Sequence, residues 1–323
     1  MKKAMLYLII FVATGEIMIR FDESFTLLSE NRIVKIPTDI VITPEFDLVK
    51  KGNFPNNPND LRIMVIGDSY IHGGGIEFDN NFSQQLKKML LAKKLTFDNI
   101  WVLDVSKSSS NNLDNNQTYF QFVDKFNPNI VIIGYNLNDI DGNLEKPKEG
   151  RINIENFNKN NPSGRKAQST IRKINKIIYQ SKFIHFIFKK THSYLKTFGI
   201  IIPNSRFDFT MKSYYQNKSN WKKSKALLSE IIEDTLEKQI QLIVYKFPEV
   251  NLLEYPKLFS KANESIKLYF DNYPSVIYAN GSETLKGEKS DEYILSKYDG
   301  HPNEKAHKKM AEDVFNVITK NKN

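Results

Sequence analysis

The stretch IMVIGDSYIHGGGIEF, residues 63–78, passes from an apolar run straight into Gly-Asp-Ser and then three glycines. An apolar run that ends on a glycine predicts a strand buried on both faces and stopped by a sharp turn. Two interpretations of the turn follow. It is an ordinary connection from a strand to a helix, or it presents Ser69 as a nucleophile. The rest of the chain has to decide between them.

Further short apolar runs alternate along the chain with segments of helical periodicity. Continuous apolar runs separated by helices are typical of a parallel sheet that is covered on both faces. The predicted fold class is therefore α/β, with a three-layer sandwich architecture. Strands are expected at 62–67, 100–106, 129–136, 241–248 and 275–281, and helices at 83–94, 118–126, 221–239 and 303–320.

The pattern of the first 21 residues predicts a segment that directs the chain across the cytoplasmic membrane. Lys2 and Lys3 precede the apolar run AMLYLIIFVATG. This run is short for a membrane span, and it resembles a signal-peptide core with Ala13 and Gly15 at plausible cleavage spacing. Alternatively the helix continues and forms an uncleaved membrane anchor. Both versions place the body of the protein outside the cytoplasm, in a periplasmic or other extracytoplasmic compartment. A buried first helix of a cytosolic domain is the competing interpretation.

Two further regions depart from the alternating pattern. Residues 22–60 are polar and contain several prolines, which predicts a linker or covering segment ahead of a main domain at 61–323. Residues 141–220 are basic and aromatic-rich and predict an insertion in that domain. Within it, residues 171–188 have apolar positions at helical spacing opposite basic ones. This segment either covers the edge of the sheet, lies on a membrane surface, or forms a mobile lid.

Composition excludes several classes of function. The chain has 323 residues with 46 lysines and arginines against 37 acidic residues, and no cysteine. Disulfides, thiol catalysis and cysteine metal sites are therefore excluded. The basic residues are scattered, which favours a solvated surface over an anionic partner. Nucleic-acid-binding signatures and the HExxH zinc motif are missing from the sequence, so nucleic acid, metal and cofactor are not expected.

The loops that follow the predicted strands carry the polar residues. In an open parallel sheet, the loops beyond the carboxyl ends of the strands collect at one edge. These loops contain Gly67-Asp68-Ser69, DVSKSSSNN (104–112), GYNLND (134–139) and YDGHPN (298–303). A serine, hydrogen-bond donors, an asparagine and an Asp-x-His motif are therefore expected to lie close together.

A nucleophilic serine needs a base within hydrogen-bond reach and a third group to orient it. Of the five histidines, only His301 is predicted to lie in a loop, with Asp299 two residues before it. The next two residues, Pro302 and Asn303, predict the start of a helix. The other four are expected in the insertion, inside the last helix, or three residues beyond Ser69 in the same turn; they are His185, His192, His307 and His72.

These residues carry a resemblance to a known family. GDSYIHGGG, GYNLND and DGHPNEKAH resemble, in order, three blocks of the SGNH-hydrolase superfamily, the GDSL-type esterases and lipases, over residues 60–320. The resemblance implies a flavodoxin-like parallel sheet of about five strands and ester hydrolysis without a cofactor. The pattern differs from the nucleophile elbow of α/β-hydrolases, because Ile71 stands where that motif needs glycine.

The resemblance assigns roles to the motif residues. Ser69 resembles the nucleophile, and its backbone N–H would be one oxyanion donor. His301 resembles the general base and Asp299 its orienting carboxylate. Many members of the family have this aspartate three residues ahead of the histidine, where this chain has Tyr298, so the spacing resembles a variant of the block.

Two more oxyanion donors are implied. Asn138 resembles the asparagine whose amide points at the oxyanion, because Asp139 follows it as in the family's Asn-Asp pair. A gap-free alignment from Gly134 selects Asn136 instead. Ser106 stands where the family usually has a glycine that donates its N–H, and it is the candidate for that position.

The expected function is a serine esterase of the cell envelope. It would remove acyl groups, with acetyl preferred, from an envelope carbohydrate through an acyl-serine intermediate. Lipid is the second substrate class, and the N-terminal segment would provide the contact with the membrane. Rival hypotheses are an O-acyltransferase that moves the acyl group onto a glycan and a non-catalytic glycan-binding protein.

Overall fold

The computed structural model describes residues 43–140, except 53, 56 and 94, and residues 218–320, except 297 and 298, together with residues 14, 211 and 214. The predicted signal or anchor segment therefore lies almost wholly outside the described residues, as do most of the predicted insertion and its segment 171–188. Apart from residue 14, all described residues belong to one compact unit made of residues 34–145 and 206–323.

The core of this unit is a five-stranded sheet in which every pairing is parallel. The strands are β1 (Leu61–Gly67), β2 (Ile100–Asp104), β3 (Ile130–Tyr135), β4 (Gln241–Lys246) and β5 (Val276–Asn280), in the order β2-β1-β3-β4-β5. This is the flavodoxin-like order, whose topological switch point lies between β1 and β3. The predicted α/β class and five-stranded parallel sheet are confirmed.

The apolar runs form strands because both faces of the sheet are covered. Every residue of β1 and of β3 is buried. Successive side chains of a strand point to opposite faces. Ile63 and Val65 accordingly belong to one hydrophobic cluster, and Met64 and Ile66 to the other.

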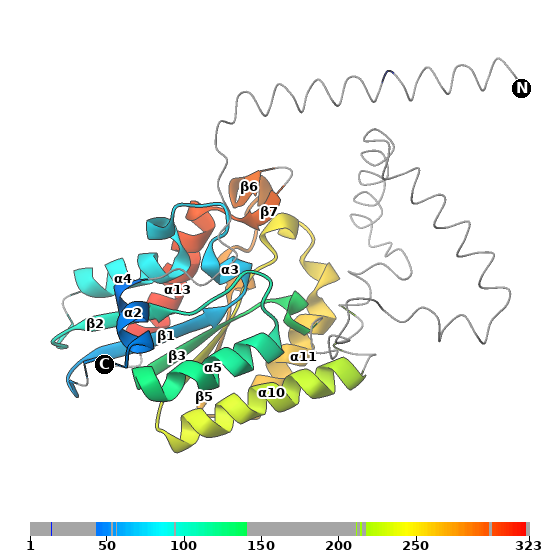
Figure 1. Ribbon diagram of the computed structural model, residues 1–323. Helices are drawn as coiled ribbons and strands as arrows, with labels where there is room; N and C mark the ends of the chain where they lie inside the picture. The colour runs from blue at the N-terminus through cyan, green and yellow to red at the C-terminus, as the bar shows by residue number, and fades with distance from the viewer. Residues whose placement is uncertain are drawn as a thin grey trace, which may run out of the picture. The chain divides into compact units, whose positions relative to one another are not determined.

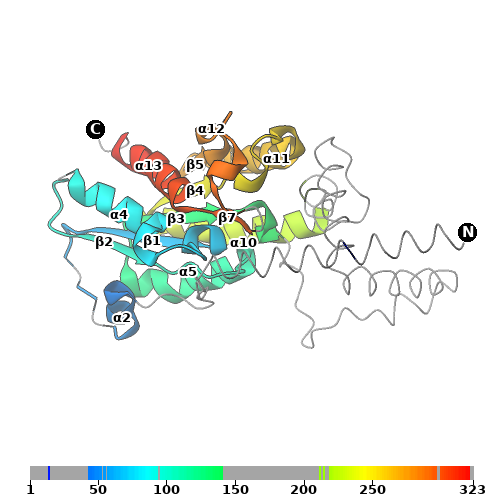
Figure 2. The ribbon, with the colours of Figure 1, turned by 90° about the horizontal axis from the view of Figure 1, so that it is seen from above.

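Helices pack on the two faces and complete the three layers (Figures 1 and 2). One face carries α5 (Asn112–Phe126), α10 (Lys218–Glu237) and α11 (Ser260–Phe270). The other carries α4 (Phe82–Ala92) and α13 (Glu304–Lys320). On α4 the spacing of Phe82, Leu86 and Leu90 places all three against the sheet, fully buried. Each such side chain contributes about 1.5–3 kcal/mol of burial free energy.

Part of the predicted covering segment is a short helix, α2 (Pro44–Lys50). Thr43 caps it, accepting the N–H of Phe46 through its side chain. The ring of Phe46 lies 5.6 Å from that of Phe122 on α5, measured between centroids, and Val49 is fully buried beside it. Residues 43–50 therefore pack on the core, while 22–42 lie outside the described residues.

Short elements occupy the connections. They are α3 (Ser69–His72), η1 (Phe78–Asn80), η2 (Leu137–Ile140), η3 (Val250–Leu252), η4 (Pro256–Leu258), α12 (Gly281–Thr284), η5 (Ser290–Glu292) and the antiparallel pair β6 (Ile294–Ser296) and β7 (Asp299–Pro302). The sequence did not predict α11 or the β6–β7 pair. No helix among the described residues is long and apolar enough to cross a bilayer.

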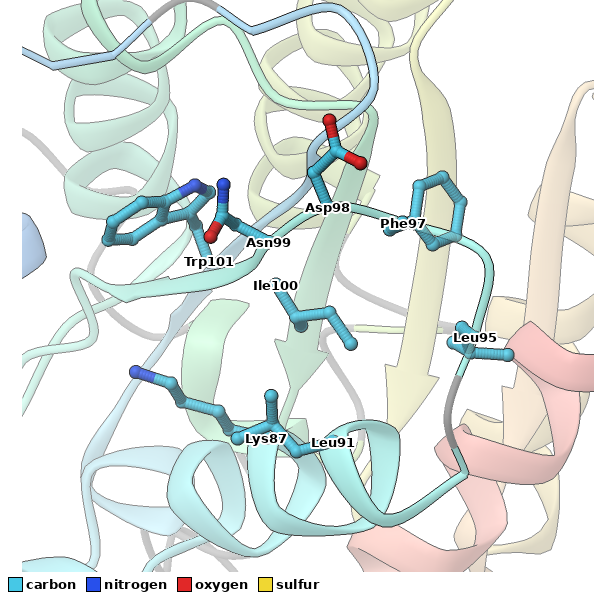
Figure 3. Close-up of a pocket in the computed structure, with 8 residues that line it drawn as sticks. All are labelled: Lys87, Leu91, Leu95, Phe97, Asp98, Asn99, Ile100 and Trp101. Carbon is cyan, nitrogen blue, oxygen red and sulfur yellow. The ribbon is translucent and has the colours of Figure 1, made fainter.

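A pocket of about 350 Å³ lies at the amino end of the edge strand β2. Figure 3 shows its lining, which comes from the second half of α4, the following connection and the first residues of β2. Leu91 and Trp101 form parts of its wall. Since functional loops of open parallel sheets gather at the carboxyl ends of the strands, this pocket lies at the opposite end of β2 from the predicted site.

Candidate active site

Two glycines in neighbouring strands make room for the turn that carries Ser69. Gly67 of β1 and Gly134 of β3 are partners in the parallel register. A Cβ atom on Gly134 would lie 2.2 Å from Cγ1 of Ile71, and a Cβ on Gly67 would lie 2.6 Å from the same atom. Ile71 is fully buried, so it has little room to move away. The two glycines therefore allow the chain to turn directly from β1 into α3.

Asp68 starts the helix that follows. Its backbone is extended, and its carboxylate accepts the N–H of Tyr70 at 2.9 Å. Such N-caps satisfy a backbone donor that has no partner inside the helix. Ser69 becomes the first helical residue, and Gly73 ends the helix in the left-handed conformation. The turn thus places Ser69, half-buried, at the carboxyl end of β1 beside the switch point of the sheet.

The structure brings Ser69, His301 and Asp299 into one hydrogen-bonded chain. Oγ of Ser69 lies 3.1 Å from Nε2 of His301, and Nδ1 of His301 lies 2.6 Å from Oδ1 of Asp299. The imidazole and carboxylate side chains remain 40% and 39% exposed. A serine, a base and an orienting carboxylate in this geometry can carry out nucleophilic attack on a carbonyl. Among the described histidines, His301 is the one that hydrogen-bonds to Ser69.

His301 was expected in a loop, and the structure places it on strand β7 instead. Residues i and i+2 of a strand lie on the same face, which explains why an Asp-x-His spacing lets Asp299 reach His301. The pairing of Ser296 with Asp299 and of Ile294 with Pro302 holds the strand in place. The run ILSKYDGHP is too short for strand periodicity to be visible in the sequence.

The two asparagines after β3 have different environments. Asn136 is buried, its Oδ1 accepts the N–H of Leu137 at 2.8 Å, and its Nδ2 donates to Asp68 at 3.4 Å. Asn138 is exposed, and its side chain also hydrogen-bonds to Asp68. An oxyanion donor must be open to the substrate. The geometry therefore favours Asn138 over Asn136 for this role.

A tyrosine near the end of the predicted insertion supports the loop that contains Asn138. The hydroxyl of Tyr214 donates to the carbonyl oxygen of Leu137 at 2.7 Å and lies 3.0 Å from the hydroxyl of Tyr135. Tyr214 is buried, so this polar contact is shielded from water. It holds the backbone next to Asn138.

The structure does not offer Ser106 as a free oxyanion donor. Its backbone N–H donates to Oδ1 of Asp104 at 2.9 Å, and its hydroxyl donates to the same oxygen. Asp104, the last residue of β2, also accepts from Asn81, which caps α4. The expectation that the Ser106 N–H faces the substrate is therefore corrected: it closes a buried turn. The N–H of Ser69 and the amide of Asn138 remain as candidate donors.

Asp68 is the buried ionisable group of the site, with 1% of its surface exposed. Burial raises its pKa from 3.8 to about 6, while the hydrogen bond from Tyr70, the positive charge of His301 and the amides of Asn136 and Asn138 oppose the rise. In the sequence, Asp68 stands out only as part of the Gly-Asp-Ser motif. The sequence feature that could have identified Asp68 is its position between a strand end and a predicted helix.

An aromatic wall borders the imidazole. The ring of Tyr70 lies 5.7 Å from that of His301 and 6.4 Å from that of Phe247, between centroids. Burial raises the pKa of the Tyr70 phenol far above its usual range, and the negative charges of Asp68, Glu249 and Asp299 add to this. The phenol therefore stays neutral. Sequence reasoning missed this wall because Phe247 lies on a different strand end.

His307 lies inside the last helix, as the sequence predicts, and joins two helices. It is fully buried on α13, and its Nδ1 accepts the N–H of Phe82 at 3.0 Å, which joins α13 to the start of α4. Burial, together with the smaller effect of the positive charge of His301, lowers its pKa to about 3. His307 is consequently neutral at physiological pH and holds the helix in place.

No protein-family model matches the chain, and no curated protein matches it. Solved structures with a similar arrangement include TesA (TM-score 0.46, 11% identity, 80% of this chain and 98% of that one). The psychrotrophic esterase EstA from Pseudoalteromonas sp. has a TM-score of 0.45 at 13% identity, with 81% and 97% covered. A Clostridium thermocellum family 3 carbohydrate esterase has 0.45 at 14%, with 80% and 96% covered. Likeness at this level does not decide the activity of the chain.

The two asparagines are separable by mutation. Asn138→Ala is expected to reduce kcat/KM for an aryl acetate by about a hundredfold, the usual cost of losing one oxyanion donor. Its Tm should fall less than that of Asn136→Ala, because Asn138 is exposed although its side chain also hydrogen-bonds to Asp68. Asn136→Ala should lower the Tm, because it removes two hydrogen bonds of a buried side chain. Steady-state kinetics on the folded variants measure kcat/KM. A hundredfold loss of kcat/KM in Asn136→Ala, rather than in Asn138→Ala, would reverse the assignment.

Asp68→Asn tests the buried carboxyl group. Because the folded state raises the pKa of Asp68, its stabilising contribution is full below about pH 3.8 and is lost as the pH rises through about 6. Asparagine keeps the capping oxygen and does not titrate. The free energy of unfolding of the variant, minus that of wild type, should therefore grow by roughly 3 kcal/mol between pH 3.5 and pH 8.

Urea denaturation across this pH range measures the difference. The matched control is Asp79→Asn, because Asp79 is an exposed carboxylate in the neighbouring turn. The control should not reproduce the growth of the difference that is expected for Asp68→Asn. A flat profile for Asp68→Asn would contradict the buried, titrating carboxyl group.

Proposed function

We propose that this chain is a serine ester hydrolase of the SGNH type. The observation that carries the proposal is the hydrogen-bonded chain from Oγ of Ser69 through His301 to Asp299. The motif order, with Ser69 after β1 and Asn138 after β3, supports it. The carboxyl ends of β1 and β3 form the switch point where open α/β sheets bind ligands.

The proposed mechanism begins with Ser69. Nε2 of His301 takes the proton of the hydroxyl while Oγ attacks the acyl carbonyl, and Asp299 accepts the Nδ1–H so that the imidazole keeps the required tautomer. The N–H of Ser69 and the amide of Asn138 would stabilise the developing oxyanion. The protonated His301 then donates its proton to the leaving alkoxide. Water hydrolyses the acyl-serine with His301 again as base.

The proposed substrate is a small acyl ester, with acetyl preferred, on a carbohydrate of the cell envelope. The half-exposed imidazole and carboxylate support it, because an open triad admits an ester that projects from a bulky polymer. The preference for carbohydrate over lipid rests on the family resemblance together with the N-terminal apolar segment.

The activity is tested with purified protein and acetylated polysaccharide. Release of acetate into solution would support hydrolysis, and movement of acetate onto an added sugar acceptor would support transfer. A phosphonate ester should label the peptide that contains Ser69, as read by mass spectrometry. Labelling elsewhere would contradict Ser69 as nucleophile.

Export is also proposed, from the pattern of residues 1–21. Fusing residues 1–40 to alkaline phosphatase should produce phosphatase activity in a bacterial host, since this reporter folds only outside the cytoplasm. Replacing Leu6, Ile9 and Ile10 by Glu should abolish it, because charges disrupt an apolar core of a signal or anchor. Equal activity of both fusions would contradict export.

A further inference from the structure

We propose that a second pocket, beside the catalytic strand β7, is a binding subsite for a neutral sugar ring. The pocket has a volume of about 280 Å³ and lies at the carboxyl ends of β4 and β5, between η3, α11 and α12. The proposal rests on the proposed function, because the sugar would belong to the same polymer that carries the ester.

The pocket adjoins the catalytic residues through η3. Two residues at this segment, Glu249 and Leu252, line the pocket. Asn251, which lies between them in the sequence, packs against Gly300 of the catalytic strand. A Cβ atom on Gly300, the residue between Asp299 and His301, would lie only 2.9 Å from Cβ of Asn251. One short segment therefore separates the pocket from the catalytic strand, which suits a ligand that is covalently continuous with the ester.

A buried ion pair forms one wall. Lys246 is fully buried and donates from Nζ to both carboxylate oxygens of Glu249, at 2.8 and 2.6 Å. The side chain of Glu249 remains 12% exposed. The lysine neutralises and orients the carboxylate, and the carboxylate keeps lone pairs for hydroxyl donors. Sequence reasoning missed both residues, since Lys246 sits at the end of an apolar run.

A buried oxygen atom of Asn263 indicates what kind of ligand the pocket binds. Asn263 on α11 lines the pocket, and within the described part of the chain its buried Oδ1 has no hydrogen-bond partner. Buried acceptors are satisfied in most proteins, so an orphan of this kind points to a ligand or water donor. The proposed partner is a sugar hydroxyl, because a hydroxyl both donates and accepts hydrogen bonds.

The remaining lining matches a sugar ring in polarity and charge. Leu252, Leu253 and Pro256 offer apolar surface for the C–H face of a pyranose. At the rim, Glu283 pairs with Lys286 at 3.2 Å. Every charged lining residue thus has a partner of opposite charge, which favours a neutral sugar over an acidic one. The volume is near the lower limit of about 300 Å³ for small-molecule sites, which suits one ring.

Asn263→Ala is the variant that tests the subsite. It removes an unsatisfied acceptor, so the Tm should not fall. With an acetylated xylo-oligosaccharide as substrate, KM should rise at least tenfold while kcat changes less than twofold. With 4-nitrophenyl acetate, which has no sugar, kcat/KM should stay within twofold of wild type. The matched control is Asn316→Ala, an exposed asparagine of α13, which should change neither substrate.

Binding is measured separately from turnover. Calorimetry with unacetylated xylotetraose, mannotetraose and chitotetraose should show binding of at least one to wild type and a tenfold weaker binding to Asn263→Ala. No binding of any of the three would overturn the sugar subsite. A loss confined to long-chain aryl esters would overturn it in favour of an acyl pocket. Failure of ester hydrolysis with sugar binding intact would contradict the proposed function and leave the subsite standing.

Discussion

Ser69→Ala is expected to abolish ester hydrolysis. The change removes the atom that attacks the carbonyl, and losses on the order of 10⁴-fold or more accompany removal of such a nucleophile. The Tm should be nearly unchanged, because Ser69 is half-buried and its Oγ hydrogen-bonds to the partly exposed His301. Initial rates with 4-nitrophenyl acetate and with acetylated oligosaccharide measure the effect.

A matched serine makes the result interpretable. Ser229→Ala removes a hydroxyl that donates to two backbone carbonyls of its own helix α10, at 2.9 and 3.0 Å, and also hydrogen-bonds to Tyr269 on α11. It should retain full activity. Substantial turnover by Ser69→Ala, above the rate of the reaction without protein, would rule out the serine mechanism. Asp299→Asn should also lose most activity, since the imidazole would no longer be held in the required tautomer.

Gly134→Ala is expected to have the second largest effect, on both stability and activity. The new Cβ would lie 2.2 Å from Cγ1 and 2.4 Å from Cδ1 of Ile71, and 3.0 Å from the ring of Phe247. Overpacking of a core typically costs about 1–3 kcal/mol of unfolding free energy. Relief of the clash would push α3 outward together with Ser69. A displacement of about 1 Å can reduce turnover a hundredfold.

A double-mutant cycle identifies the cause. Ile71→Ala alone leaves a cavity and should destabilise the protein by about 2–5 kcal/mol. In the double variant, the methyl group added by Gly134→Ala fills part of that space, so the total should be smaller than the sum of the two single effects. Urea unfolding and kcat are measured for all four proteins. Additive effects would show that Gly134 and Ile71 do not share the contact.

The sequence by itself determined the layers, the strand positions of the parallel sheet and three members of the candidate site. Apolar runs such as IMVIG can be recognised in the sequence because a strand buried on both faces needs an unbroken run of apolar residues. Amphipathic helices can be recognised because their apolar residues recur every three to four positions. Ser69, His301 and Asp299 were identified because each lies within a short motif at a predicted strand end or helix start. All of this information is contained in neighbouring residues.

Only the tertiary structure decided how these motifs meet. Ser69 and His301 are 232 residues apart, so no local pattern reports their 3.1 Å contact. The same holds for Ile71 over Gly134 and for the pocket that Asn263 and Glu249 both line. Each depends on the space and the hydrogen-bond partners left by a distant segment. Pairing across the sheet and packing on it create these constraints, and they exist only once the chain has folded.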